Sequence, residues 1–214
     1  TIASEYIGHS GVIRIGSKWG ESQVTKVGKS WADVQTVRNR KEWYQLPAKK
    51  PGKLLLQKIS GQSMRSILNS CNAEVDCNFY EVFPEDTDTI KGLAVYLNSA
   101  LAFIQRELIG RVNLGDGALK VEGIDWERIL VPKKDLLLSL AETAEVQFEA
   151  LCGRSIKDIG TEAKRKDRME FERKVAESLG LPGEVAQDIL GAVVDLVEER
   201  HLLPKLLKVK KKKR

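Results

Sequence analysis

The sequence has few of the residues that build catalytic and metal sites. Its 214 residues include three cysteines and two histidines, and neither histidine has a Ser, Cys or carboxylate nearby at a spacing typical of nucleophilic catalysis. No Cys or His spacing of a metal site is present either. We expect Cys71, Cys77 and Cys152 to be reduced thiols that serve as small core residues. The sequence therefore predicts no catalytic residue and no metal ligand in this chain.

Long apolar runs are missing as well. The longest apolar-rich segment, residues 93–109, is interrupted by Asn98 and by the polar triplet 105–107, whereas a membrane-spanning helix needs about 20 apolar residues in a row. The start, Thr1–Tyr6, lacks the basic-then-apolar pattern of a signal peptide. It also lacks Met, which is typical of a piece of a longer protein. These absences predict a cytoplasmic location and no membrane partner.

What the sequence does have is a concentration of positive charge. Residues 14–65 contain twelve Lys or Arg against three acidic residues, together with Trp19, Trp31, Trp43 and Tyr44. The whole chain carries +5, and without the seven positive charges of the last ten residues the remainder sums to −2. Positive charge interleaved with aromatic side chains is typical of a surface that holds phosphates and packs against bases. The alternative is a solvated charged face whose tryptophans lie in the core.

Hydrophobic periodicity predicts mixed strand and helix in the first two thirds of the chain. One helix is expected from about Thr89 to Ile109, with a buried stripe formed by Leu93, Leu97, Leu101, Ile104 and Leu108, and with Gly110 as its stop. We place a domain boundary after residue 134. The strands are expected at Val12–Ile15, 54–59, Glu74–Phe83, Ala118–Val121 and Ile129–Val131.

Residues 135–204 are predicted to form a helical C-terminal subdomain, with helices at Leu136–Cys152, Arg165–Leu179 and Glu184–Arg200. The last two helices and their glycine-containing turn resemble a helix-turn-helix. However, the second helix carries five acidic residues and one arginine, and DNA phosphates would repel it. We therefore predict an αα-hairpin. Pro204 is expected to end the helix before a disordered basic tail, 205–214, which either adds non-specific affinity for nucleic acid or is simply solvated.

The glycine-rich segment Gly110–Gly117 does not match a phosphate-binding loop. It has no Gly-Lys-Ser/Thr and follows a predicted helix, so its glycines are interpreted as turn residues. Arg111 and Lys120 flank this turn and are placed to reach a ligand together. Three carboxylates of the same region suggest a nuclease cluster, but we interpret them as surface acids: Asp116, Glu122 and Asp125.

Three segments, in order, resemble a known family. They are Glu42–Pro47 with Lys53–Gln57, then Cys77–Pro84 leading to Leu97–Leu101, and finally Gly110–Arg111 through Gly115–Lys120 to Leu130–Pro132. This succession resembles the C-terminal target-recognition (TaqI-like specificity) region of adenine-specific DNA methyltransferases of restriction–modification systems. The segment 179–197 is similar to the helical part that closes such chains. The resemblance implies an α+β fold: a mixed-sheet target-recognition domain with a helical C-terminal subdomain.

One part of such an enzyme has no counterpart in this sequence. These methyltransferases carry an Asn/Asp-Pro-Pro-Tyr motif that holds the flipped adenine and a glycine-rich loop for S-adenosylmethionine. All six prolines of this chain are isolated, and no strand leads into a Gly-x-Gly loop. The resemblance therefore implies the specificity half alone, as a fragment, a subunit or a remnant. The S-adenosylmethionine cofactor is expected for the catalytic half and not for this chain.

The predicted function is sequence-selective binding of double-stranded DNA, which presents a target adenine to a methyltransferase catalytic domain or subunit supplied elsewhere. Asn78 and Asn113 are candidates for contacts with adenine, or are turn and cap residues. Two alternatives stay open: an interaction module that binds an acidic partner, and a stand-alone nuclease or RNA-binding protein. The predicted phosphate contacts, some of whose arginines would contact guanine edges, are Arg38, Arg40, Lys41, Lys49, Lys50, Lys53, Lys58 and Arg65, with Arg111 and Lys120 beside the glycine turn.

Overall fold

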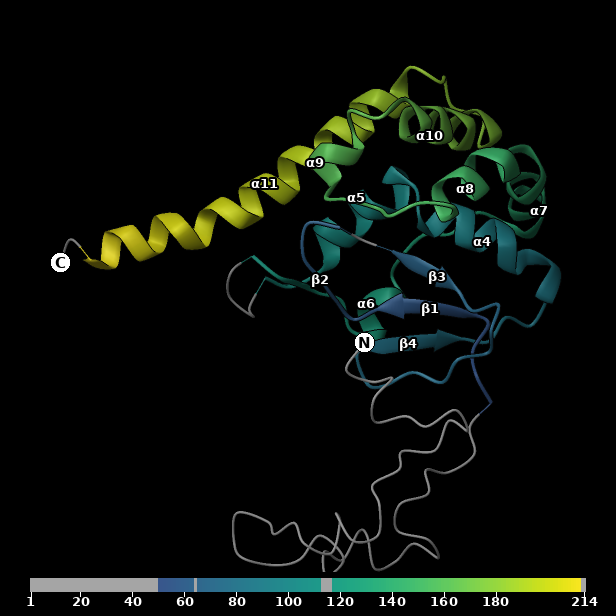
Figure 1. Ribbon diagram of the computed structural model, residues 1–214, viewed down its shortest axis with the longest axis horizontal. Helices are drawn as coiled ribbons and strands as arrows, with labels where there is room; N and C mark the ends of the chain where they lie inside the picture. The colour runs from purple at the N-terminus through teal and green to yellow at the C-terminus, as the bar shows by residue number, and fades with distance from the viewer. Residues whose placement is uncertain (1–49, 64, 113–116, 213–214) are drawn as a thin grey trace, which may run out of the picture. The chain divides into compact units, whose positions relative to one another are not determined.

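The computed structural model describes residues 50–63, 65–112 and 117–212, with residues 205–212 described by their backbone alone (Figure 1). The chain divides after Lys50, and every element below belongs to the unit Pro51–Arg214. The strand predicted at Val12–Ile15 lies outside the described residues. Among the helices described, none is both long and apolar enough to cross a membrane.

The central strand is β1 (Leu54–Gln57), which pairs antiparallel with β3 (Ser66–Leu68) on one side and β4 (Phe79–Val82) on the other. Its three leucines alternate between the two faces of the sheet and are all buried, so the predicted central strand is confirmed. Gly52 lies against β4, where an added Cβ would be 2.7 Å from the Cβ of Glu81. The strand predicted from Glu74 is shorter and begins at Phe79.

A second small sheet pairs β2 (Ile59–Ser60) with β5 (Leu119–Lys120), followed by the short helix α6 (Gly123–Trp126). The strand predicted at Ile129–Val131 is wrong. Side chains, not a neighbouring strand, satisfy the backbone of Leu130: its carbonyl accepts from the Tyr96 hydroxyl at 2.8 Å, and its N–H donates to Gln105 Oε1 at 2.8 Å. Pairing with tertiary partners of this kind leaves no trace in the local sequence pattern.

The long helix predicted over 89–109 is two helices, α4 (Ile90–Leu97) and α5 (Ala100–Ile109), which follow the 3-10 turn η2 (Thr87–Thr89). At the break, Asn98 receives the N–H of Ser66 at 3.1 Å and donates its own amide to the Ser66 carbonyl at 2.8 Å. Ser99 then has an extended backbone. The Leu97–Leu101 motif therefore contains a helix break tied to strand β3.

The break changes which residues are buried. The stripe expected at Leu93, Leu97, Leu101, Ile104 and Leu108 is only partly inside, since Leu108 is 71% exposed. In a continuous helix the same face stays buried along the whole length. Because α4 and α5 are separate helices, α5 buries a face that does not continue that of α4. In α5 the fully buried positions are Ala100, Ala102, Phe103 and Arg106 instead.

Five more helices follow: α7 (Lys134–Thr143), α8 (Glu145–Cys152), α9 (Ile159–Glu162), α10 (Lys166–Ser178) and α11 (Val185–Lys212). The predicted helix at 136–152 is thus divided at Ala144. Helices α10 and α11 pack against each other, which confirms the αα-hairpin. The helix end expected at Pro204 is wrong, because α11 continues to Lys212 and includes most of the segment predicted as a disordered tail.

Helices α4, α7, α8 and α10 lie on one side of the three-stranded sheet (Figure 1). One core cluster joins β1 to α4, α7, α8 and α10, and therefore includes residues on both sides of position 134, such as Leu54 and Phe171. A second cluster joins α5, β5, α9 and α11. Gly92 lets α4 and α7 approach closely, since a Cβ there would lie 1.8 Å from the Leu137 carbonyl oxygen. The predicted α+β class with a helical C-terminal part is confirmed, with antiparallel sheets.

The three cysteines are free but exposed. The prediction that they serve as small core residues is therefore wrong. Cys71 and Cys77 lie in the connection between β3 and β4, and Cys152 is the last residue of α8. Apolar neighbours in the sequence suggested burial, but these neighbours are themselves in turns or at element ends.

Candidate nucleic-acid interface

Three of the predicted basic residues converge where the two small sheets meet. Lys58 connects β1 to β2, Lys120 lies on β5, and Arg111 follows α5. The backbones of Arg111 and Lys120 bond to each other in both directions, at 2.8 and 2.9 Å, and Val121 N–H donates to the Lys58 carbonyl at 2.9 Å. We call Lys58, Arg111 and Lys120, with Tyr80, Glu122 and Asp125, the turn cluster. Its backbone is fixed by hydrogen bonds between segments distant in sequence.

Glu122 lies at the centre of the turn cluster. Its Oε2 accepts from the Tyr80 hydroxyl at 2.6 Å and is 3.2 Å from Lys58 Nζ, and its Oε1 pairs with Lys120 Nζ. Hydrogen bonds from Lys120, Tyr80 and Lys58 lower the pKa of Glu122 to about 2, against a smaller opposing effect of burial. The same contact with Glu122 raises the pKa of Lys58. At neutral pH this is an ionised carboxylate held by three donors.

Asp125 holds the third cation. One carboxylate oxygen receives Arg111 Nη2 at 3.1 Å, and the other receives the N–H of Glu122 at 2.9 Å, which begins helix α6. The pKa of Asp125 is lowered mainly by the hydrogen bond from the Glu122 backbone N–H. The positive charges of Arg111 and Arg128 lower it further. Asp125 is buried, while half of the Arg111 side chain is exposed. The guanidinium is therefore anchored at one edge and open to solvent at the other.

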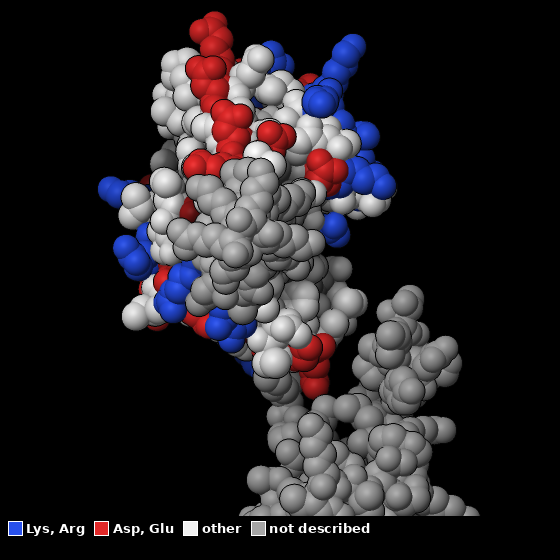
Figure 2. All heavy atoms as spheres, turned by 90° about the vertical axis from the view of Figure 1, so that its left-hand side faces the viewer, with Lys and Arg blue, Asp and Glu red and all other residues white. Residues whose placement is uncertain are grey.

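The turn cluster has more positive than negative charge. Lys58, Arg111 and Lys120, joined by the exposed Arg128, face two carboxylates. The Lys58 ammonium also lies 5.6 Å from the centre of the Tyr80 ring. In Figure 2 acidic side chains gather in the upper part of the face and again at its lower edge, and Lys and Arg side chains lie along its lower left and upper right. Positive charge on this face is therefore grouped, not evenly spread.

The other candidates lie elsewhere or outside the described residues. Lys53 immediately precedes β1 and donates to Asn72 Oδ1 at 3.0 Å; five residues of extended chain place it roughly 16 Å from Lys58. Lys50 and Asn78 are exposed, and Asn78 bonds to Asp76 at 2.8 Å, as a turn residue does. Four predicted phosphate contacts and Asn113 lie in the part that the structure does not describe: Arg38, Arg40, Lys41 and Lys49.

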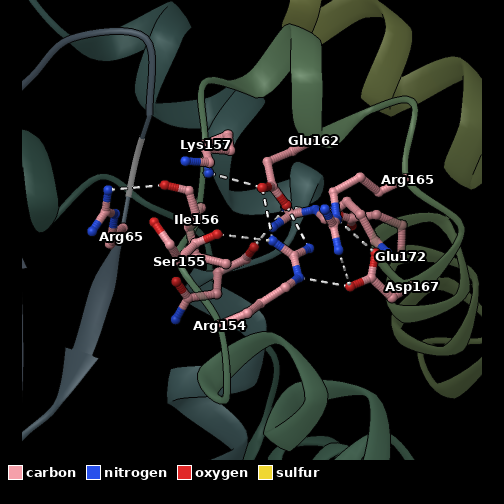
Figure 3. Close-up of polar contacts among 11 residues, drawn as sticks. Arg65, Arg154, Ser155, Ile156, Lys157, Glu162, Arg165, Asp167 and Glu172 are labelled. Carbon is pink, nitrogen blue, oxygen red and sulfur yellow. Dashed lines mark hydrogen bonds and ion pairs between the residues drawn. The ribbon is translucent and has the colours of Figure 1, made fainter.

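Arg65 belongs to a different surface, a groove of about 290 Å³ between β3 and the end of α8. It donates to the Ile156 carbonyl at 3.2 Å across this groove (Figure 3). Behind it, Arg154 binds both oxygens of Glu162, at 2.8 and 2.7 Å, and Asp167 at 2.6 Å. These two acidic partners occupy the Arg154 guanidinium, and Arg65 stays exposed at the rim.

Several of these residues were not predicted from the sequence. Tyr80 lies within the strand predicted at Glu74–Phe83, but nothing in that pattern indicates a contact with Glu122. Glu122 was interpreted as a surface acid. Arg154 had no distinguishing pattern, since its acidic partners follow eight and thirteen residues later, in the separate helices α9 and α10. The sequence feature that could have indicated the turn cluster is Glu122, an acidic residue two positions after Lys120.

Neither a metal-binding group nor a glycine-rich cofactor loop occurs among the residues that the structure describes. Among them no group of three or more His, Cys, Asp or Glu side chains could hold a metal. Within residues 50–63, 65–112 and 117–212, no strand leads into a glycine-rich loop that opens a helix, the arrangement that cradles a dinucleotide or a similar cofactor.

Comparison with known proteins places the chain in a family. Residues 28–164 match the family described as Type II methyltransferase M.Eco57I, C-terminal domain. This range covers more than half of the chain and includes the turn cluster, both sheets and the helices up to α9. No curated protein matches significantly, and no solved structure does. The chain belongs to the family of C-terminal domains of type II methyltransferases that is named after M.Eco57I.

Proposed function

We propose that this chain is the DNA-recognition part of an adenine-specific DNA methyltransferase of a restriction–modification system. It binds double-stranded DNA sequence-selectively and presents a target adenine to a catalytic domain or subunit. That catalytic part binds S-adenosylmethionine and supplies the methyl-transfer chemistry. The observation that carries the proposal is the family match over residues 28–164, because it assigns the chain to the C-terminal domains of type II methyltransferases.

The distribution of charge supports the DNA part of the proposal. Residues 1–50 contain nine Lys or Arg and four acidic residues, whereas residues 51–204 contain nineteen Lys or Arg and twenty-six acidic residues. A chain with an acidic body binds a polyanion only through local groups of cations. The predicted contacts Arg38, Arg40 and Lys41 belong to the basic N-terminal segment. The turn cluster is the corresponding group within the acidic body.

The cations of these two groups have different roles in the proposal. Lysines such as Lys58 and Lys120 act as point charges that position the duplex through its phosphates. A guanidinium can instead donate two parallel hydrogen bonds to guanine, and Arg111 has its outer edge open for this purpose. Sequence selectivity is assigned to arginines of this kind, and general affinity to the lysines.

Binding of the full chain to a labelled 30-base-pair duplex, measured by fluorescence anisotropy at several salt concentrations, tests the proposal. A protein with six or more phosphate contacts loses about a thousandfold in affinity between 50 and 200 mM salt. Selection from a randomised duplex library should yield one preferred sequence that contains adenine. Absence of duplex binding even at low salt would contradict the proposal and favour an acidic protein partner.

Two further measurements separate this function from its alternatives. Reversing three charges with Arg38→Glu, Arg40→Glu and Lys41→Glu should abolish duplex binding. The matched change of the exposed Lys164 and Lys166 and the partly exposed Lys174 to Glu should not. Incubation of the pure protein with magnesium and a plasmid should leave the plasmid intact. Sustained cleavage would identify a nuclease, and a preference for single-stranded RNA over the duplex would identify an RNA-binding protein.

A further inference from the structure

The hydrogen-bond donors of the turn cluster, which hold the Glu122 carboxylate in the structure, are also suited to a different anion. We infer that Lys58, Lys120 and Tyr80 form a binding site for one phosphodiester group of the DNA backbone, and that the Glu122 carboxylate fills this site when no DNA is present. This inference rests on the proposed function, because it takes the phosphate group to come from DNA. It adds a specific site, with its ligand class, and a role for an acidic residue.

The geometry of Glu122 supports the exchange. A carboxylate and a phosphodiester each present two equivalent oxygens that share one negative charge. In the structure one oxygen of Glu122 takes the Tyr80 hydroxyl at 2.6 Å and Lys58 Nζ at 3.2 Å, and the other takes Lys120 Nζ. The two non-bridging oxygens of a phosphodiester can accept the same three donors. Glu122 thus stands in for the phosphate group.

The backbones that carry the donors are held by contacts that do not involve the Glu122 side chain. Tyr80 lies on β4 opposite Leu56, and Lys120 lies on β5 opposite Ile59. Lys58 is held at both backbone groups: its N–H donates to the Asn78 carbonyl at 2.9 Å, and its carbonyl accepts from Val121 at 2.9 Å. Groups fixed by the fold lose little freedom when they bind a ligand, so the array is already organised for an anion.

The site is open enough for the exchange to happen. The side chains of Lys58, Lys120 and Glu122 are 27%, 28% and 24% exposed. Glutamate has three rotatable bonds and can turn its carboxylate into solvent, whereas Arg111 and Asp125 keep the neighbouring end of α6 in place. By contrast, the Arg200–Glu107 pair is 4% and 3% exposed, and no phosphate can reach it without unfolding.

The consequence for DNA binding is a weaker non-specific affinity. Each phosphate that a protein neutralises contributes about 0.9 to the dependence of log K on log salt for duplex DNA. Because Glu122 competes for Lys58 and Lys120, this contact forms fully only when other contacts already hold the duplex in register. Competition of this kind penalises wrong sequences more than the right one, as specificity requires.

The variant Glu122→Gln tests the inference in the full chain, with Glu127→Gln as the matched control. Glu127 is exposed, lies at the other end of α6 and makes no ion pair among the described residues. We expect Glu122→Gln to bind a random-sequence duplex on the order of tenfold more tightly at 0.1 M salt and to increase the salt slope by about one. Glu127→Gln should change neither quantity. Adding Tyr80→Phe to Glu122→Gln should remove part of the gain.

The possible results separate this inference from the proposed function. If the wild-type chain binds duplex DNA but Glu122→Gln matches it at every salt concentration, the phosphate site is wrong and the proposed function stands. If neither protein binds DNA, the proposed function fails, and titration of Glu122→Gln with pyrophosphate decides the site by NMR. Shifts of the Lys58 and Lys120 amide signals support the site, and unshifted signals overturn it.

A second variant covers the case in which Glu122→Gln does not fold. Lys58→Gln combined with Lys120→Gln keeps Glu122 and removes two of its donors. If the site holds a phosphate in the complex, this double variant should lower the salt slope for duplex binding by about one or more. An unchanged slope would overturn the site. Thermal unfolding of each variant confirms that binding is compared between folded proteins.

Discussion

The helical layer and the turn cluster use ionic groups in opposite ways. In the helical layer, Arg168 pairs with Glu172, and Arg200 pairs with Glu107; each of these four side chains is at most 4% exposed. In the turn cluster, Glu122 and the two lysines paired with it are each about a quarter exposed. A buried pair cannot lose one partner without leaving an unpaired charge out of water, but an exposed pair exchanges its partner for water or for a ligand.

This difference separates a structural from a functional use of charge. Glu172 also accepts the N–H of Ala100 at 2.9 Å at the start of α5, so the buried pair both joins α10 to α5 and satisfies a helix end. Burial raises the pKa of Glu172 although Arg168 opposes the effect. The buried pairs therefore specify how helices meet. The turn cluster, which shares their chemistry but not their burial, is available to a partner.

The largest expected effect comes from breaking a buried pair. Arg200 binds both oxygens of Glu107, at 2.8 and 3.0 Å, and the carbonyls of Gly61 at 2.9 Å and of Gly117. Arg200→Ala should lower the free energy of unfolding by about 3–5 kcal/mol, because Glu107 stays buried without a cation. Urea denaturation measures this loss. The exposed pair Arg173–Glu177 is the control, and Arg173→Ala should cost about 0.5 kcal/mol or less. Equal losses of unfolding free energy in Arg200→Ala and Arg173→Ala would contradict the proposed difference between buried and exposed ion pairs.

A smaller effect, of opposite sign, is expected at Arg106. This residue is fully buried, and its side-chain nitrogens have no hydrogen-bond partner among the described residues. It lies 4.7 Å from the centre of the Trp126 ring, and burial lowers its pKa to about 10. Arg106→Met should stabilise the protein by about 1–4 kcal/mol in urea denaturation. Arg106→Lys keeps the charge and should give no gain. If Arg106→Met were destabilising, interactions other than the contact with the Trp126 ring would have to stabilise the Arg106 guanidinium.

The partly exposed Asp167 should show its effect in acid. Although burial opposes ionisation, Arg165 and Arg154 lower the pKa of Asp167 to about 2. A carboxyl group with a lowered pKa in the folded state stabilises that state above its unfolded pKa, and the stabilisation is lost as the pH falls toward 2. The Asp167→Asn variant should therefore lose less stability than the wild type between pH 4 and pH 2. The urea midpoint at each pH measures this loss. Asp188→Asn, at an exposed position of α11, should keep the wild-type slope.

The smallest effect on stability is expected in the turn cluster. Lys58→Gln removes one donor to Glu122, and water takes its place because the pair is partly exposed. The urea midpoint should equal that of the wild type within error, while duplex binding weakens. A loss of stability as large as that of Arg200→Ala would show that the turn cluster is as structural as the buried pairs.

Much of the secondary structure follows from local pattern. The leucine run of β1 and the spacing of α10 predicted these elements within one or two residues, because burial of one or both faces of an element sets its period. Among the helices, three boundaries did not follow: the break at Asn98, the break at Ala144 and the continuation through Pro204. The first depends on bonds to Ser66, thirty-two residues away. Such partners cannot be deduced from a window of neighbouring residues.

The candidate site was predictable in part for the same reason. Arg111 and Lys120 flank a glycine turn, and the structure brings their backbones together with Lys58 from a distant strand. The pattern did not indicate that each cation would meet an acid. Counting Lys and Arg measures charge, but only the positions of Glu122 and Asp125 determine how much of that charge is open to a ligand.

By itself, the sequence determined the α+β class, the central strand, the helical hairpin and the resemblance to a methyltransferase recognition region. These properties depend on periodicity and on motifs, which are local. The tertiary structure alone decided that the cations of the turn cluster meet at one carboxylate, and that Arg65 spans a separate groove. Burial and pairing depend on residues brought together from distant parts of the chain, and they determine which charges hold the fold and which stay open to a partner.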